Sequence, residues 1–242
     1  MTFTPHSASR SHKGHVRALN EDAFYTDSDQ GIWCVADGMG GHDAGEVASA
    51  LVVESVAGVT ARGELQSTVN AIQEAVSHVN YRLTEERTLG LQNQVMGSTV
   101  VAVVIMDEEC ACLWAGDSRL YLYRADCLYQ MTRDHSVVEE LIQQGVIQPE
   151  EAESHPQRHV ITRAVGADSA LELEMISFAL QAGDVLLLCS DGLYGELTPE
   201  QIMTILGAGQ DSETMAGRLI ERVLAGQARD NVTVSVISLQ AS

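Results

Sequence analysis

The chain reads IWCVADGMGG from Ile32 to Gly41. Five apolar residues are followed by one acidic residue, Asp37, and then by a glycine-rich turn. A short, continuously apolar run bounded by glycine is typical of a strand inside a packed sheet. The stretch therefore predicts a carboxylate at the end of a buried strand.

Three other aspartates hold the same kind of position, at a boundary between an apolar run and a turn. They are Asp117, after residues 111–116, Asp191, after residues 185–190, and Asp230, just before residues 232–237. Carboxylates at the ends of packed strands can converge on one rim, where their repulsion is tolerated only if cations neutralise it. Together with Asp37, these residues predict an enzyme that uses hard metal ions.

Composition sets the class of protein. The chain has 242 residues, of which 45% are hydrophobic and 20% charged, a balance typical of a globular protein with a substantial core. We expect one domain over residues 1–242. Its apolar runs fall short of the roughly 18 to 20 residues that span a bilayer, and residues 1–17 do not resemble a signal peptide. The sequence predicts a cytoplasmic protein without membrane insertion.

Charge and cysteine content exclude two further classes. The formal net charge is −20 at pH 7, whereas binding to a phosphate backbone needs a basic face, so no nucleic-acid partner is expected. We interpret most of the acidity as surface solubility. The five cysteines lie mostly in or beside strand-like segments, and Cys110 and Cys112 have no second Cys or His pair to complete a zinc site. They are interpreted as structural thiols.

Hydrophobic periodicity predicts layers of strands and helices. One helical face is predicted by apolar residues spaced alternately by four and three, namely Leu65, Val69, Ile72, Val76, Val79 and Leu83. Further helical patterns cover residues 45–59, 137–144, 199–206 and 213–224, and strand patterns cover residues 99–105, 111–115, 120–123, 184–190 and 231–239. Strands grouped in runs, with helices inserted in pairs, favour an α+β layered sandwich over a regular βαβ alternation.

Several motifs occur together in a fixed order. Besides Asp-Gly at 37–38 and 191–192, the chain has RALNED at 17–22, GDSR at 116–119 and RDN at 229–231, each at a strand boundary. Asp-Gly alone is a common tight turn. The ordered set, spread from about Gly14 to Asn231, resembles the metal-dependent serine/threonine protein phosphatases of the PP2C (PPM) family.

The resemblance implies a fold and a reaction. The fold is a four-layer αββα sandwich of two antiparallel sheets flanked by helices. The reaction is hydrolysis of phosphoserine and phosphothreonine on proteins at a binuclear Mn²⁺ or Mg²⁺ centre, by a stand-alone bacterial enzyme that opposes a Ser/Thr kinase. Two such ions can share a water and lower its pKa, so that it attacks phosphorus in line without a phosphoenzyme.

The resemblance also assigns roles to residues. It implies that Asp37 bridges the two ions, that the Gly38 carbonyl binds one of them, and that Asp191 and Asp230 complete the other. Asp117 with Asp191 would hold a weaker third ion, and Glu21 and Asp22 would hold metal-bound waters. Arg17 would bind the substrate phosphate. Carboxylates and a carbonyl suit Mn²⁺ and Mg²⁺, whereas thiolates and imidazoles would select zinc. Arg17, Asp37, Asp191 and Asp230 form the implied catalytic set.

Structural alternatives stay open at several of these positions. Arg17 is also compatible with an ordinary surface arginine, Asp22 with a turn cap, and Asp117 with a hairpin between two strands. At Met39 the chain departs from family members that carry a histidine there as general acid. Met39 cannot donate a proton, and our hypothesis for the source is a water on the third ion near Asp117. The direction of His42 in the glycine-rich loop is not fixed by the sequence.

Residues 134–165 match the flap of the family, which borders the substrate groove. His155 and His159 are four apart, as in a helical metal pair, but Pro156 argues against a helix, so they are interpreted as solvated loop residues. We expect the flap to influence which phosphoproteins are accepted. The expected partners are phosphorylated proteins, including a Ser/Thr kinase and phosphopeptide-binding proteins, and the chain is expected to be monomeric.

Two other functions remain as alternatives. The first is a catalytically silent regulator that binds phosphoproteins, which is disfavoured because every implied metal-binding carboxylate is present. The second is a phosphatase of a small phosphate ester, since the sequence has no additional specificity domain that would exclude it.

Overall fold

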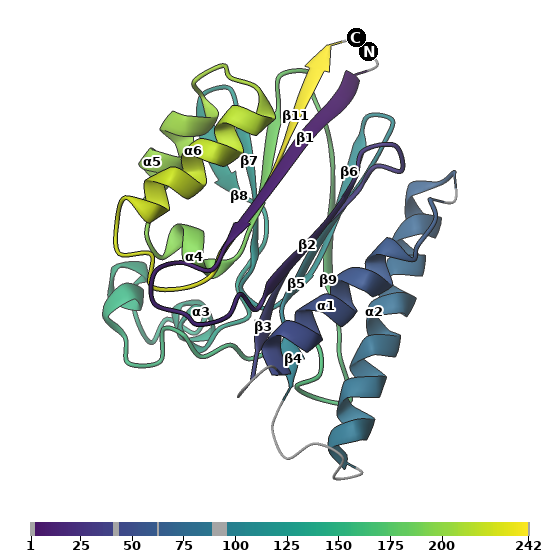
Figure 1. Cartoon of the computed structure of the whole chain (residues 1–242), viewed down its shortest axis with the longest axis vertical. Helices are drawn as coiled ribbons and strands as arrows, with labels where there is room; N and C mark the ends of the chain where they lie inside the picture. Colours follow the sequence, from purple (N-terminus) through teal and green to yellow (C-terminus); the bar gives the residue numbers. More distant parts are fainter. Residues whose placement is uncertain (1–2, 41–43, 62, 89–95, 242) are drawn as a thin grey trace.

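The computed structural model describes residues 3–40, 44–61, 63–88 and 96–241. Two antiparallel sheets lie face to face at its centre (Figure 1). The first has the strand order β1 (Phe3–His12), β11 (Val232–Ala241), β10 (Val185–Cys189), β7 (Arg119–Arg124) and β8 (Cys127–Gln130). The second has the order β2 (Asp22–Asp27), β3 (Ile32–Met39), β5 (Val100–Met106), β6 (Glu109–Ala115) and β9 (Glu174–Ala179), with the short β4 (Gly97–Ser98) paired to β3.

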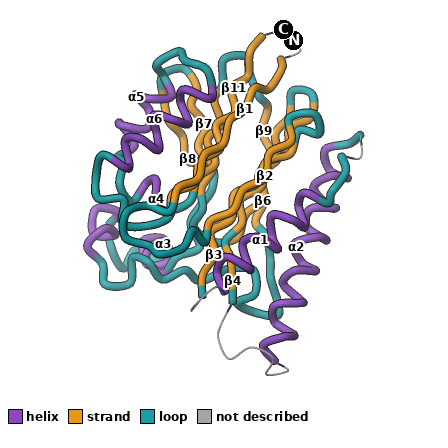
Figure 2. Tube along the Cα trace, viewed as in Figure 1, coloured by secondary structure: helices purple, strands orange, loops and turns teal. Residues whose placement is uncertain are grey.

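Helices cover the outer face of each sheet (Figure 2). The second sheet is covered by α1 (Ala44–Ala57) and α2 (Leu65–Thr88), and the first by α4 (Asp191–Tyr194), α5 (Pro199–Leu206) and α6 (Ser212–Leu224). Between β8 and β9 lie α3 (Val137–Gln143) and a 3₁₀ turn, η1 (Pro149–Ser154). The predicted four-layer αββα sandwich is confirmed, as are the two long helices after residue 44.

The central strands are apolar because both of their faces are buried. Along β3, Ile32, Cys34 and Ala36 pack towards the helical layer, whereas Trp33 and Val35 pack between the sheets. A strand buried on both faces needs a continuous apolar run instead of an alternating one. Residues 32–36 therefore anchor Asp37 in a rigid element.

The sequence analysis missed the first strand. β1 has the polar sequence FTPHSASRSH and pairs with β11 from Phe3↔Ala241 to His12↔Val232. Its partly buried serines bond across the ladder, with Ser9 Oγ donating to Ser235 Oγ at 2.9 Å and Ser11 Oγ lying 2.7 Å from Thr233 Oγ1. The strand is thus held by its partner and not by hydrophobicity of its own. The short strand β8 was also missed.

In isolation, the dipeptide Asp191-Gly192 would be typical of a tight turn. These residues instead open the one-turn helix α4, directly after β10. Gly192 packs closely against the loop before β11. A Cβ at this position would be only 1.9 Å from the Asn231 carbonyl oxygen. Only glycine permits this approach.

We predict opposite effects of alanine at two helical glycines. Gly192→Ala places a methyl group on backbone that cannot move aside, and should lower the free energy of unfolding by on the order of 2 kcal/mol. Gly217→Ala, in α6, meets no atom within 4 Å and should raise it by roughly 0.5–1 kcal/mol. Urea unfolding of both variants measures the two effects. Equal stability of the two variants would contradict the packing described for Gly192.

Candidate metal and phosphate site

A cavity of about 440 Å³ opens at the end of the sandwich where β3 finishes. It gathers residues from widely separated parts of the chain. Its lining includes Arg17, Glu21, Asp37, Gly38, Asp117, Asp191 and Asp230. These are all the residues that the resemblance implicated, except Asp22, which lies behind Asp37. The convergence on one rim that the strand-end aspartates predicted is therefore present.

Asp37 is fixed by its backbone. Its N–H donates to Thr99 Oγ1 at 2.9 Å, and its carbonyl accepts from the Thr99 N–H at 2.8 Å. Burial, followed by the charges of Asp22 and Asp191, raises the pKa of the Asp37 carboxyl well above its ordinary value. The next residue must be glycine, because a Cβ on Gly38 would lie 2.0 Å from the Gly45 carbonyl oxygen.

Asp22 and Glu21 supply acceptor oxygens that the protein leaves unpaired. Asp22 lies opposite Asp37 in the β2–β3 ladder. The Ser190 hydroxyl donates to its Oδ2 at 2.7 Å, but Oδ1 is buried without a partner, as is Glu21 Oε1. Burial is the main cause that raises the pKa of Asp22 to about 6 and that also raises the pKa of Glu21. Buried, unpaired oxygens of this kind call for a cation or ordered water.

Asp230 and Asp191 come from the first sheet. Asp230 Oδ1 accepts from the Asn231 N–H at 2.8 Å, and Oδ2 accepts from Arg17 Nη2 at 2.6 Å. Burial, followed by the charge of Asp230, raises the pKa of Asp191 to about 7. The sequence suggested Arg17 as a phosphate ligand, and in this structure it forms an ion pair with Asp230.

Asn231 ties the loop that carries Arg17 to β11. Its Oδ1 accepts from the Glu21 N–H at 2.7 Å, and its Nδ2 donates to the carbonyls of Lys13 and Leu19 at 3.0 and 2.9 Å. Because Asn231 also lies next to Asp230, one side chain sets the position of the whole RALNED segment relative to the carboxylates.

Asp117 follows β6 in the GDSR turn, and hydrogen bonds link this turn to the strand that holds Asp37. Ser118 Oγ lies 2.7 Å from Thr99 Oγ1, which in turn accepts from the Asp37 N–H. Burial, followed by the charge of Asp191, raises the pKa of Asp117 to about 7. The hairpin left open for Asp117 is wrong, because this segment leads from β6 in the second sheet to β7 in the first, and the two strands do not pair. The Asp117 carboxylate lines the cavity.

The donor set fits hard divalent cations. Carboxylates predominate around the cavity, two buried carboxylate oxygens lack partners, and burial together with neighbouring carboxylates raises the pKa values of Asp37, Asp117 and Asp191. Within the described ranges, no three His, Cys, Asp or Glu side chains are gathered tightly enough to hold an ion alone. The carboxylates that line the cavity are nevertheless the oxygen ligands that Mn²⁺ and Mg²⁺ prefer.

The flap contributes residues that the sequence did not assign to the site. His159 and Ile161 line the cavity, whereas His155 does not belong to its lining. Ser136 and Ile161 form an isolated bridge that closes the base of this segment. His159 was interpreted as a solvated loop residue; it is indeed exposed, and it also lines the cavity that holds the carboxylates. Gly41 and His42 lie outside the described residues.

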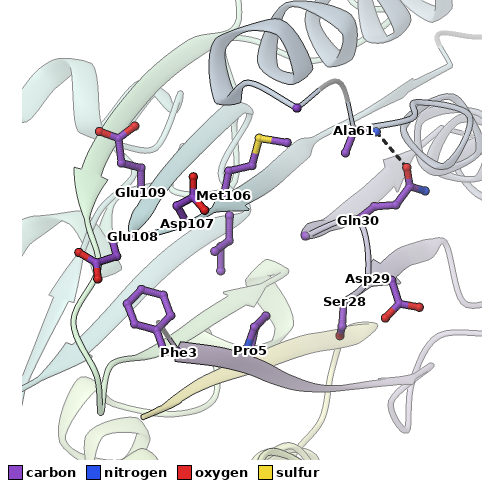
Figure 3. Close-up of a pocket in the computed structure, with 13 residues that line it drawn as sticks. Phe3, Pro5, Ser28, Asp29, Gln30, Ala61, Met106, Asp107, Glu108 and Glu109 are labelled. Carbon is purple, nitrogen blue, oxygen red and sulfur yellow. Dashed lines mark hydrogen bonds between the residues drawn. The ribbon is translucent and has the colours of Figure 1, made fainter. Parts of the chain in front are cut away.

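A larger cavity, about 760 Å³, lies at the opposite end of β3 (Figure 3). It is lined by Phe3, Ile105, Met106 and the acidic residues of two hairpins, Asp29, Asp107, Glu108 and Glu109. These carboxylates come from loop tips, whereas those of the smaller cavity are held at the ends of buried strands. We therefore place the candidate metal site in the smaller cavity.

An αββα sandwich with oxygen donors gathered at one end of its strands defines the class of metal-dependent phosphatases. The profile of the protein phosphatase 2C family matches residues 9–224. The chain belongs to this family.

Individual relatives agree with this placement. The serine/threonine protein phosphatase PstP of Mycobacterium tuberculosis is 39% identical over 239 residues, which are 98% of this chain and 45% of PstP. The chain thus spans somewhat less than half of that relative. The structure of PppA, a key regulatory component of T6SS in Pseudomonas aeruginosa, has a TM-score of 0.91 at 38% identity and covers 98% of this chain and 99% of PppA.

A second solved structure contains metal. The catalytic domain of PstP in complex with two manganese ions has a TM-score of 0.86 at 36% identity, covering 99% of this chain and 100% of that one. It supports a binuclear centre in this family. Separately, no helix among the described residues has the length and apolarity required to cross a membrane.

We predict that metal-free protein becomes less stable as the pH rises. For Asp117 and Asp191 the folded-state pKa is about 7 and the ordinary value is 3.8, so the folded state binds more protons than the unfolded state between these values. Stability therefore falls with rising pH across this window. The unfolding midpoint in EDTA should be lower at about pH 8 than at about pH 5, and Mg²⁺ should stabilise most at the higher pH.

A variant that tests this prediction is Asp191→Asn, which removes one of the two carboxylates whose pKa is raised. It should reduce the pH dependence of the midpoint in EDTA. An EDTA-treated wild type that gains stability as the pH rises through the window would contradict the mutual repulsion inferred here.

Proposed function

We propose that this chain is a protein serine/threonine phosphatase that hydrolyses phosphoserine and phosphothreonine with Mn²⁺ or Mg²⁺. The observation that carries the proposal is the convergence of Asp37, Asp117, Asp191 and Asp230 with one guanidinium, that of Arg17, around a single open cavity. Family membership and the two-manganese relative support it.

We propose the metal ligands that the family resemblance implies. Asp37 and the Gly38 carbonyl, at the end of β3, would hold one ion; Asp37, Asp191 and Asp230 would hold the other; and Asp117 with Asp191 would hold a weaker third. The unpaired oxygens of Glu21 and Asp22 would accept hydrogen bonds from the waters that complete the shells. When bound, the two main ions supply an activated water as nucleophile and polarise the phosphate.

Arg17 would change partners during the reaction cycle. Its Nη2 lies 2.6 Å from Asp230 Oδ2, so a cation on Asp230 and the guanidinium compete for one carboxylate. With Asp230 serving as a metal ligand, the planar fork of Arg17 would be free to bind two phosphate oxygens. The half-exposed side chain stays at the cavity mouth, where an incoming phosphate arrives first.

Departure of the serine or threonine alkoxide requires a proton. Met39 lines the cavity but cannot supply one, whereas His159, from the flap, lines the same cavity and can. We therefore propose His159 as a proton donor, in addition to the water suggested by the sequence. The flap would then take part in the chemistry as well as in the choice of substrate.

We also propose the biological setting. The substrates would be phosphoproteins, among them a Ser/Thr kinase and phosphopeptide-binding proteins, and the chain would act as a single catalytic domain and a monomer. All five cysteines are free thiols, four of them buried, as is usual in a reducing compartment. This supports the cytoplasm as the location.

The first prediction is metal-dependent turnover of a phosphothreonine peptide. Wild type should release phosphate with Mn²⁺ and not with EDTA, and Asp37→Asn and Asp191→Asn should each lower kcat/KM by on the order of 10³-fold or more, because they remove carboxylates that hold the ions. Asp29→Asn, at the other end of the sandwich, is the matched control. A folded, Mn²⁺-loaded wild type that turns over no phosphopeptide would overturn the proposal.

The second prediction concerns the leaving group. His159→Asn should lower kcat by about 10²-fold for a phosphothreonine peptide. It should have little effect on an aryl phosphate, whose phenolate departs without a proton. His155→Asn, in the same flap but outside the cavity, should match wild type on both substrates. An equal loss on both substrates would show that His159 affects binding or flap structure instead of proton transfer.

A further inference from the structure

Tyr194 connects two of the acidic segments of the site. Its hydroxyl donates to the Asp117 backbone carbonyl at 2.9 Å. Tyr194 is the last residue of the one-turn helix α4, and Asp191 is the first. Residues three apart lie on the same side of a helix, so one helical turn both presents Asp191 and anchors the backbone of Asp117.

Arg119 fixes the ring of Tyr194. Its guanidinium carbon lies 3.5 Å from the ring centroid, a close cation–π contact. The same guanidinium donates to Asp134 through Nε and Nη2, at 2.9 and 2.6 Å, and through Nη1 to the Tyr121 hydroxyl at 2.7 Å. The Arg119 and Asp134 side chains are only 20% and 12% exposed. A side chain held from three directions has little freedom, and it confines the ring stacked upon it.

The Asp117 and Asp191 carboxylates line one cavity together with Asp37 and Asp230, and like charges gathered in one cavity repel each other. Unrestrained, the GDSR turn would relax away from α4. The Tyr194 hydroxyl is placed to oppose this movement, since it donates to the Asp117 backbone carbonyl at 2.9 Å. The bond is made to the backbone, so it restrains the position of Asp117 without using its carboxylate oxygens.

We propose that Tyr194, held by Arg119, is a positioning residue that keeps Asp117 within reach of a cation shared with Asp191. The inference rests on the proposed function, in which these two carboxylates hold the third and weakest ion. Tyr194 touches neither substrate nor metal in this assignment. Its effect should therefore be on the affinity of one ion, leaving the two ions held by Asp37 and the chemical step at saturating metal nearly unchanged.

The test is Tyr194→Phe, which removes the hydroxyl and keeps the ring over Arg119. Calorimetric titration of the metal-free protein with Mn²⁺, without substrate, should show the weakest site about fivefold weaker, the effect of losing one hydrogen bond, with the tighter sites unchanged. Hydrogen exchange of the metal-free protein should be faster at the amides of residues 116–118. The Mn²⁺ concentration for half-maximal turnover should rise by a similar factor at unchanged kcat.

Tyr121→Phe is the matched control. It removes another buried hydroxyl from the same Arg119 network, at a position with no bond to Asp117, and should affect the unfolding midpoint but not the weakest Mn²⁺ site. Asp117→Asn, which should lose the weakest Mn²⁺ site, identifies that site in the titration.

The proposal is overturned if Tyr194→Phe binds Mn²⁺ like wild type or if all sites weaken equally. It is also overturned if Tyr121→Phe weakens the same site as much, or if wild type has no Mn²⁺ site that depends on Asp117. Phosphopeptide turnover by wild type is measured separately, so failure of the proposed function is distinguished from failure of this inference.

Discussion

The repulsion between the buried carboxylates is the interaction around which the site is organised. Burial, followed by the charges of neighbouring carboxylates, raises the pKa of Asp37, Asp117 and Asp191. Such a cluster does not form from flexible segments, because the charges would move apart into water. It exists here because each aspartate stands at the end of an element that is itself buried.

The rigidity of those elements comes from the layering. β3 and β10 are apolar on both faces, since helices cover one side and the opposite sheet covers the other. The carboxylates on their ends therefore cannot be displaced without disturbing two cores. Close backbone packing adds to this constraint at Gly38 and Gly192, where a side chain would collide with backbone of the neighbouring segment. The packing contacts that stabilise the fold therefore also fix the positions of the charged side chains.

Short polar contacts set the remaining geometry. Asn231 positions the RALNED segment, and Thr99 and Ser118 link the GDSR turn to β3. The Arg119, Asp134 and Tyr194 network reaches the same turn from the side of α4 and the flap. Several weak contacts from different elements therefore oppose the electrostatic tendency of the cavity to open. A bound cation would offset the mutual repulsion of these carboxylates.

The sequence by itself determined the layered architecture, the position of the acidic residues at strand ends and the family, because apolar runs, helical periodicity and ordered motifs are local properties of the chain. Three features depend on tertiary contacts. β1 is a strand because β11 pairs with it along its whole length, and its own polar residues carry no strand signal.

His159 lines the same cavity as the aspartates because of where the flap packs, and Arg17 binds Asp230 across 213 residues of chain. Contacts between residues so distant in sequence depend on where whole elements pack, and no spacing rule within the sequence encodes that.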